Sequence, residues 1–436
     1  MKTDHSYTAE VKVKSAISIK HQILIIGGGT AGITVASQLK RKVRGLDIAI
    51  IEPSDKHYYQ PAWTLVGAGT YNLKATIREE KDVIPKGVTW IKAYAETIDA
   101  ENNEVVTKDG KQIRYEYLIV AAGIQYDWGA IPGLKETIGK NGVTSNYDKR
   151  YAEYTWELLQ NFKGGNALFT QPATPIKCGG APQKIMYLAE EYFRKHHLRE
   201  NTNVIYATPG SVIFGVEPWK TTLNNIVEER NIKPRYFHKL VEIRPDTKEA
   251  IYEVTNLNGE TLTQDDIDLS MGMRIEGSDR VVIPYELLHL APPQSAPDFI
   301  KKSPLTKEED PYGWVDVNKF TLQNNRFANV FALGDVTNTP NAKTGAAVRK
   351  QAPILVQNLL RVMDNQNLTG QPEYHGYGSC PMVTGYGKML LAEFDYDNQA
   401  TPSLPIDTSK PRWSMWLLKK YFLPWFYWNR MLKGKG

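Results

Sequence analysis

The two cysteines of this chain are its most reactive side chains, and their surroundings favour redox chemistry. Cys178 lies in the run Pro-Ile-Lys-Cys-Gly-Gly-Ala-Pro, and Cys380 lies in the run Ser-Cys-Pro. Free cysteines are most often inert and buried as small apolar side chains. Here small and rigid residues leave little bulk around both sulfurs, and the positive charges of Lys177 and Lys184 would lower a thiol pKa. We therefore favour a redox-active pair over two inert core residues.

A dinucleotide site is predicted near the N-terminus, where a strand, a glycine-rich turn and a helix follow one another. The apolar run 21–26 leads directly into Gly-Gly-Gly-Thr-Ala-Gly at 27–32. Gly27 permits a tight turn, Gly29 lets the backbone approach a pyrophosphate, and Gly32 allows the helix to pack closely on the sheet. A second strand then ends at Glu52, about 20 positions beyond the turn, where a carboxylate can accept a hydrogen bond from a ribose hydroxyl. The residues expected to hold this nucleotide are Gly27, Gly28, Gly29, Thr30, Ala31, Gly32 and Glu52.

Two later segments indicate that the dinucleotide is FAD. The run 117–123 is a strand that ends in small residues, and the run 329–335 is a strand that ends in Gly-Asp. Asp335 can bond the ribityl chain or the pyrophosphate side of FAD, although a strand that merely stops at a Gly-Asp turn is the alternative. Residues 343–347 then open a helix, whose N-terminal amides would stabilise negative charge on a reduced flavin ring. The remaining residues expected at this cofactor are Gln60, Ala95, Gly123, Asp335, Lys343, Thr344, Gly345 and Ala346.

The middle of the chain predicts a second Rossmann-type repeat without a second nucleotide. A strand at 165–170 is followed by a loop that contains prolines and Cys178 in place of a glycine fingerprint. Prolines lack the amides that a phosphate would need. A helix that begins near Ala181 and a strand at 203–207 continue the pattern, so this loop suits the presentation of a thiol better than the binding of NADH.

These patterns predict an α/β chain with two Rossmann-type repeats, as in flavoproteins with two dinucleotide-binding domains, followed by an amphipathic membrane-binding segment. The expected organisation is a flexible N-terminus (1–20), the first part of the FAD domain (21–150), a Rossmann-like domain with Cys178 (151–315), the second part of the FAD domain with Cys380 (316–400) and C-terminal membrane-binding helices (401–436).

Composition excludes several other classes of protein. The chain has 436 residues, 42% hydrophobic and 23% charged, with a net charge of +5, which is ordinary globular usage without a basic cluster for nucleic acid. No run of 18 apolar residues predicts a membrane span. Two cysteines provide no disulfide scaffold, and no metal site is expected. Residues 1–20 are polar and resemble neither a secretory signal nor a clear transit peptide.

The C-terminal tail is unusually aromatic. Residues 413–428 hold eight aromatic side chains in 16 positions, and basic residues follow at 430, 433 and 435. Aromatic and basic side chains together are typical of segments that insert shallowly into a membrane interface. Pro424 is expected to divide the tail into two short segments. The alternative is an arm that packs on a dimer partner or on the core of its own chain.

Four segments together resemble the sulfide:quinone oxidoreductase family, in the type found in mitochondria and related bacteria. They are Tyr-Gln-Pro-Ala-Trp-Thr-Leu-Val-Gly-Ala-Gly (59–69), Cys-Gly-Gly-Ala-Pro-Gln-Lys (178–184), Ser-Cys-Pro-Met-Val-Thr-Gly-Tyr (379–386) and Tyr-Trp-Asn (427–429). The resemblance runs from about Lys20 to the end of the chain. It implies FAD, an active-site pair of Cys178 and Cys380, and peripheral, monotopic membrane attachment. Because 1–20 lacks an evident presequence, a bacterial inner membrane is favoured over the mitochondrial inner membrane.

The resemblance also implies the reaction. Hydrogen sulfide, as hydrosulfide, would attack a Cys178–Cys380 disulfide or trisulfide. Two electrons would pass through FAD to ubiquinone or menaquinone, and the sulfane sulfur would pass to sulfite, glutathione or coenzyme A. Lys184 is a candidate for attracting an anionic acceptor, and Tyr386 and Phe394 are candidates for a quinone pocket, with a solvated lysine and core packing as the alternatives.

Two other functions stay open for the same fold. A type II NADH:quinone oxidoreductase would need a nucleotide turn that residues 171–180 do not provide. A non-catalytic, membrane-associated flavoprotein would leave both cysteines incidental. His57, His238 and His375 are interpreted as histidines without a catalytic part.

Overall fold

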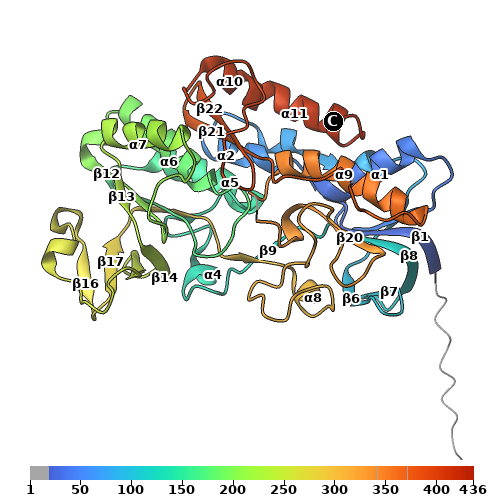
Figure 1. The fold of residues 1–436 in the computed structure, drawn as a ribbon. Helices are drawn as coiled ribbons and strands as arrows, with labels where there is room; N and C mark the ends of the chain where they lie inside the picture. Colours follow the sequence, from blue (N-terminus) through green and yellow to red (C-terminus); the bar gives the residue numbers. More distant parts are fainter. Residues whose placement is uncertain (1–18, 341, 371) are drawn as a thin grey trace, which may run out of the picture.

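The computed structural model describes residues 19–340, 342–370 and 372–436 and contains two parallel sheets side by side (Figure 1). Apart from its last two positions, the N-terminal segment that we expect to be flexible lies outside these residues. The first sheet is built on five parallel strands: β1 (Ile19–Ile26), β2 (Ile48–Ile51), β5 (Thr89–Ile91), β8 (Gln112–Val120) and β20 (Val330–Ala332). Residues 23–26 and 48–51 are buried, as continuous apolar runs in a parallel sheet require.

Helices and hairpins surround this sheet. The side chains of α1 (Thr30–Lys42) and α9 (Gly345–Met363) share one apolar core with β1, β2 and β8. The antiparallel strands β6 (Ala95–Asp99) and β7 (Glu104–Thr107) continue the same sheet beyond β8, and their apolar side chains share a second core with residues 296–336. Between β2 and β5 lie β3 (Lys56–Tyr58), α2 (Trp63–Gly67), β4 (Ile77–Glu79) and α3 (Glu80–Val83).

The second sheet confirms the predicted second repeat. Its five parallel strands are, in spatial order, β10 (Val143–Thr144), β18 (Leu287–Leu290), β11 (Gly165–Thr170), β12 (Thr202–Ala207) and β13 (Lys233–Arg235). The helices of this unit are α5 (Lys149–Asn161), α6 (Ala181–Lys195) and α7 (Trp219–Glu229). The cysteine-bearing loop 171–180 therefore connects β11 to α6, at the place where a second nucleotide turn would lie. Short elements complete the connections: β9 (Gln125–Tyr126), α4 (Leu134–Thr137), β19 (Gln294–Ser295) and α8 (Asp298–Lys301).

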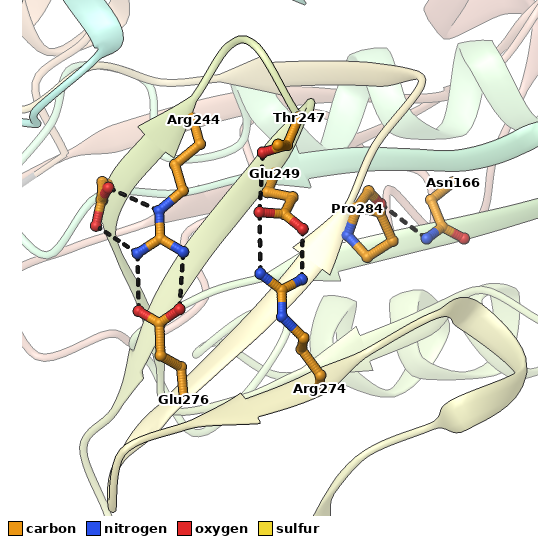
Figure 2. Close-up of polar contacts among 8 residues, drawn as sticks. Asn166, Arg244, Thr247, Glu249, Arg274, Glu276 and Pro284 are labelled. Carbon is orange, nitrogen blue, oxygen red and sulfur yellow. Dashed lines mark hydrogen bonds and ion pairs between the residues drawn. The ribbon is translucent and has the colours of Figure 1, made fainter.

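A four-stranded antiparallel sheet packs against the second parallel sheet. It consists of β14 (His238–Arg244), β15 (Glu249–Val254), β16 (Arg274–Glu276) and β17 (Arg280–Pro284). Figure 2 shows two arginines, Arg244 and Arg274, each in a two-pronged contact with glutamate across the strands. Asn166 of β11 donates its amide to the carbonyl of Pro284 at 2.8 Å and so fixes β17 to the parallel sheet.

A hairpin returns the late part of the chain to the second repeat. It consists of β21 (Gly378–Gly385) and β22 (Lys388–Phe394), and Cys380 pairs with Ala392 across it. Met382, Leu390 and their neighbours share a core with Ile185 and Leu188 of α6. The hairpin thereby places Cys380 next to the loop that carries Cys178.

The C-terminal tail is one continuous helical run, so the prediction that Pro424 divides it was wrong. The run consists of α10 (Trp413–Leu417), a π-helical turn (418–422), α11 (Leu423–Phe426) and a second π-helical turn (427–431). Proline lacks the amide hydrogen for the usual helical bond, and wider π turns on either side accommodate that loss.

The tail has two different faces. Met415 and Trp416 enter the core of the second repeat, while Tyr427 and Met431 enter the core of the first. The alternative of packing on the chain's own core is therefore correct for this inner face. Four large side chains remain half exposed or more on the outer face: Trp413, Tyr421, Phe422 and Trp425. None of the helices in the described ranges combines the length and the apolar character needed to cross a bilayer.

Candidate active site

Cys178 is held in an unusual backbone conformation. Its φ of +49° lies in the left-handed region, which residues other than glycine seldom adopt. Three hydrogen bonds fix it there. The Cys178 amide donates to the carbonyl of Lys343 at 3.0 Å, and the Cys178 carbonyl accepts from the amide of Ala181 at 2.8 Å and from the hydroxyl of Tyr147 at 3.1 Å. Strain that surrounding contacts maintain is characteristic of functional sites.

The two cysteines lie together although the sequence separates them widely. The pKa of the Cys178 thiol is lowered, because a hydrogen bond with Cys380 outweighs the effect of burial. The same hydrogen bond raises the pKa of Cys380, and burial raises it as well. Gly180 makes this approach possible, because a Cβ at that position would lie 2.6 Å from the Cys380 sulfur. Of the two thiols, Cys178 is therefore the one that loses its proton more readily.

A buried lysine completes this pair. Lys184 lies in the first turn of α6, is 3% exposed, and places Nζ 3.0 Å from the sulfur of Cys178. Burial opposes the charged form of Lys184, but attraction to Cys178 and Cys380 outweighs burial and raises its pKa. The structure thus brings together all three residues, and Lys184 is not a solvated surface lysine.

Sequence reasoning missed a second buried lysine, which comes from the tail. Lys419 is 4% exposed and donates to the carbonyl of Pro61 at 2.9 Å. Burial and the charge of Lys184 lower the pKa of Lys419 to about 8. From the sequence alone, a lysine in such an aromatic and basic tail is expected to face lipid. Only the folding of the tail onto the core brings it near the cysteines.

A pocket of about 230 Å³ opens onto both sulfurs. Phe394 lines this pocket, and Phe214 meets its ring edge-on at 6.3 Å between centroids. Tyr386 does not belong to the pocket lining. Its hydroxyl donates to the carbonyl of Ala68 at 3.1 Å, in agreement with the packing alternative. The other residues that line the pocket are Gln171, Gly179, Gly180, Gln183, Thr208, Gly210, Val212, Ile213, Gly215, Ala342 and Thr344.

The glycine-rich turn has the geometry of a pyrophosphate cradle. Gly27 has a φ of +105°, and a Cβ there would lie 2.4 Å from the carbonyl oxygen of Ala121. A Cβ on Gly29, by contrast, would meet no atom beyond its chain neighbours within 4 Å in the described part of the chain. The carboxylate of Glu52 accepts from the amide of Gly28 at 2.8 Å, and burial raises its pKa. This open backbone at the N-terminus of α1 fits a bound phosphate.

The second half of the expected cofactor site converges on the N-terminus of α9. Thr344 caps this helix, because its side chain accepts from the amide of Ala347 at 3.2 Å. Burial raises the pKa of the Asp335 carboxyl group and lowers that of Lys343 to about 8. Nζ of Lys343 donates to the carbonyls of Asp335 and Thr337, at 2.9 and 2.6 Å, so this lysine braces the loop before the helix.

The other three expected cofactor residues have different surroundings. Gln60 accepts a hydrogen bond from Lys177, the neighbour of Cys178. Gly123 has a φ of +69° and open space where a Cβ would lie. Ala95 starts β6 and is buried in the apolar layer under the first sheet.

A second cavity, of about 690 Å³, lies between the tail and residues 70–83. Arg78, Lys420 and Lys433 supply three positive charges to its lining, and Asp82 supplies one negative charge. Aromatic rings from the tail complete the wall, and the guanidinium of Arg78 lies 4.8 Å from the ring centroid of Trp428. This cavity therefore combines apolar and cationic surface beside the exposed aromatic side chains.

Comparison with known proteins places these features in a family. Residues 21–157 match the family model described as pyridine nucleotide-disulphide oxidoreductase. The chain is 46% identical to the mitochondrial sulfide:quinone oxidoreductase of Mus musculus, over 95% of this chain and 87% of the mouse protein. It is 43% identical to the mitochondrial sulfide:quinone oxidoreductase of Dictyostelium discoideum, over 97% and 88% of the two chains.

The fold agrees with this sequence similarity. The X-ray structure of the sulfide:quinone oxidoreductase from Aquifex aeolicus superposes with a TM-score of 0.77 at 20% identity, covering 95% of this chain and 92% of the other. Identity this low shows the fold alone, whereas the two relatives above are similar over nearly the whole length. The chain belongs to the sulfide:quinone oxidoreductase family.

Proposed function

We propose that this chain oxidises hydrogen sulfide at the Cys178–Cys380 pair and passes two electrons through FAD to a membrane quinone. The observation that carries the proposal is the trio of the partly exposed Cys178 with the buried Cys380 and Lys184, placed against the N-terminus of α9. Membership in the family supports the overall reaction.

The difference in pKa between the two thiols supports attack on Cys380 in the first step. When the pair is oxidised, hydrosulfide attacks the sulfur of Cys380, the bond between the cysteines breaks, and Cys178 leaves as the thiolate. A thiol of lower pKa is the better leaving group, and Lys184 lies 3.0 Å from the sulfur that receives the negative charge. Cys380 then carries the incoming sulfur as a persulfide.

The second step returns the pair to its oxidised state. An anionic acceptor takes the outer sulfur of the persulfide, which leaves two reduced cysteines, and their reoxidation to the disulfide releases two electrons. FAD, when bound, would supply the two-electron acceptor between this pair and the quinone. The trisulfide that the family resemblance implies would carry one additional sulfur through the same steps.

The cradle around the glycine-rich turn supports FAD as the cofactor. Gly27, Gly28, Gly29, Thr30, Ala31, Gly32 and Glu52 would hold the adenosine and pyrophosphate side, and Gln60, Gly123, Asp335, Lys343, Thr344, Gly345 and Ala346 the flavin side. Amides at the N-terminus of α9 would stabilise negative charge on the ring. Ala95 stays a weaker candidate for the adenosine end.

The pocket on the sulfurs suits a small acceptor such as sulfite, or the thiol end of glutathione or coenzyme A. Its 230 Å³ admits a few heavy atoms, and Lys184 and Lys419 lie close enough to favour an anion.

Membrane attachment through the outer face of the tail remains part of the proposal. Exposed tryptophan, tyrosine and phenylalanine would settle at headgroup depth, and the neighbouring cations would meet anionic lipid. Ubiquinone or menaquinone would then reach the protein from the bilayer. The bacterial inner membrane stays a prediction, and the two relatives described above are named as mitochondrial proteins.

Anaerobic addition of sulfide to the purified protein tests this function. Sulfide should bleach the flavin absorbance at about 450 nm, and a water-soluble quinone should restore it, while NADH should leave it unchanged. Bleaching by NADH without a response to sulfide would support a type II NADH:quinone oxidoreductase instead. If neither sulfide nor NADH changed the flavin absorbance, a non-catalytic flavoprotein would be supported.

A further inference from the structure

The C-terminal tail reaches the glycine-rich turn through one buried tyrosine. Tyr427 is 5% exposed, and its hydroxyl oxygen lies 2.8 Å from Oγ1 of Thr30 and 2.6 Å from Nε2 of His57. Thr30 belongs to the turn, and 397 positions of sequence separate it from Tyr427. A residue near the end of the chain therefore contacts the site at its beginning.

His57 carries this contact to the backbone of the turn. Its Nδ1 lies 3.1 Å from the carbonyl oxygen of Gly28 and 3.3 Å from a carboxylate oxygen of Glu80. The carbonyl of Gly28 only accepts hydrogen bonds, so Nδ1 carries a hydrogen. In the neutral ring Nε2 then accepts from Tyr427, and the Tyr427 oxygen accepts from Thr30. His57 and Glu80 are 3% and 1% exposed, so water does not replace these bonds readily.

The network holds the two residues on either side of Gly29. Gly28 is fixed on both sides of its Cα, by Glu52 on its amide and by His57 on its carbonyl. Thr30 is fixed by Tyr427. Gly29, which has open space where a pyrophosphate would lie, is thereby held between two anchored neighbours.

A second contact shows that the end of the tail is docked on the same helix. The hydroxyl of Ser37, two turns further along α1, donates to the carbonyl of Leu432 at 2.6 Å. Tyr427, Met431 and Leu432 are buried in the core that α1 and α9 share. The inner face of the tail is therefore part of the dinucleotide-binding unit.

We propose that Tyr427 is a positioning residue for the cofactor: through His57 and Thr30 it holds the turn in its binding conformation. Docking of the tail and binding of FAD then stabilise each other, because linkage between two binding events is reciprocal. This inference rests on the proposed function only in that the turn holds FAD.

Removal of the hydroxyl group alone tests the proposal. In the holoenzyme with Tyr427→Phe, FAD should be released about three- to tenfold faster than from the wild type in mild urea, followed by the rise in free-flavin fluorescence, since each lost hydrogen bond is modest. Tyr94→Phe, at a tyrosine that is 60% exposed and outside the network, should release FAD at the wild-type rate. Thr30→Val should also release FAD faster, and the double variant should be less impaired than the product of the two, because both variants lose the bond between Thr30 and Tyr427.

The coupling between tail docking and FAD binding gives a second measurement, with a result that simple loss of packing would not reproduce. In the wild type, saturating FAD should slow chymotryptic cleavage of the tail at its exposed aromatic residues, and in Tyr427→Phe this protection should shrink. Unchanged FAD release in both Tyr427→Phe and Thr30→Val, or tail cleavage that is independent of FAD, would overturn the proposal. If Tyr427→Phe does not fold, the FAD dependence of tail cleavage in Thr30→Val decides, because a direct contact of Thr30 with FAD would not couple the tail to the cofactor. Wild-type protein that binds FAD but does not respond to sulfide would contradict the proposed function and leave this inference intact.

Discussion

The two thiols differ in pKa, and the hydrogen bond between them is the largest cause of the difference. The pKa of Cys178 is lowered by the hydrogen bond from Cys380 and then by the charge of Lys184, while the pKa of Cys380 is raised. In the reduced pair Cys178 is thus the more acidic thiol, and Lys184 lies 3.0 Å from its sulfur. Such a difference in protonation is what a directional exchange between thiols and a disulfide requires.

Lys184→Met tests the charge with little change in volume. In the reduced wild type, alkylation of Cys178 by iodoacetamide should stay nearly constant from pH 8 down to about pH 6, because its thiolate persists below the usual thiol pKa of about 8.5. In the variant the charge of Lys184 is lost and the pKa of Cys178 should rise, so the alkylation rate should fall more steeply towards low pH than in the wild type. Lys195→Met, on the exposed side of the same helix, should keep the wild-type profile. A flat profile in Lys184→Met would show that this lysine does not stabilise the thiolate.

Gly180→Ala tests the approach of the sulfurs. The added Cβ would lie 2.6 Å from the Cys380 sulfur and equally close to Cε of Met382, so the hairpin must shift away from the Cys178 loop. We expect slower formation of the disulfide, measured by thiol titration after mild oxidation, and at least about tenfold slower reduction of the flavin by sulfide. Gly179→Ala, where a Cβ would have open space, is the matched control. Equal rates in the two variants would contradict the role of Gly180.

Sequence reasoning predicted the cysteines and Lys184 because residue type and local spacing carry that information. It missed Lys419 and Tyr147, because their contribution depends on long-range packing. Tyr147 precedes α5, and only the folded chain brings its hydroxyl to the carbonyl of Cys178. Lys419 has an ordinary sequence environment for a lipid-facing lysine, and its burial follows from the docking of the whole tail.

Two helix N-termini define the expected cofactor site, those of α1 and α9. The sequence predicted both, because each follows a buried strand and begins with small residues that permit close approach of a ligand. The second repeat could be predicted for the same reason. The path of the tail could not, since a single proline in a sequence does not show that neighbouring π turns will accommodate it.

Gly29→Val tests the first of these termini. The branched side chain would fill the space over the turn, and we expect protein that folds with nearly normal thermal stability but retains less than about a tenth of the wild-type FAD. Flavin absorbance relative to protein absorbance measures this. Gly129→Val is the control, since it also has open space around it but lies far from the turn in the sequence. Full flavin content in Gly29→Val would contradict the assignment of the cradle.

The two faces of the C-terminal tail have different roles in the whole molecule. The inner face closes the cores of both repeats and delivers Lys419 and Tyr427 to buried positions, and the outer face leaves aromatic rings exposed. Deletion of residues 412–436 would therefore uncover apolar core as well as remove the membrane-binding surface, so it does not isolate membrane attachment.

A double substitution on the outer face does isolate it. Phe422→Ser with Trp425→Ser should lower the fraction of protein that sediments with anionic vesicles by about tenfold, because the two rings supply much of the exposed apolar area. Flavin content and reduction by sulfide should stay near wild type, since neither ring contacts the cysteine pair. Leu269→Ser, at a large exposed side chain far from the tail, is the control. Undiminished sedimentation would assign membrane attachment to another surface.

Sulfide-dependent reduction of quinone by Cys178→Ser and Cys380→Ser tests the central claim most directly. Serine can form neither the disulfide that hydrosulfide attacks nor a persulfide, so the rate should fall by about a thousandfold or more in each variant. Flavin content and vesicle binding, measured on the same preparations, should remain near wild type. If either variant retained most of the wild-type sulfide-dependent turnover, the cysteine pair would not be the site of sulfide oxidation.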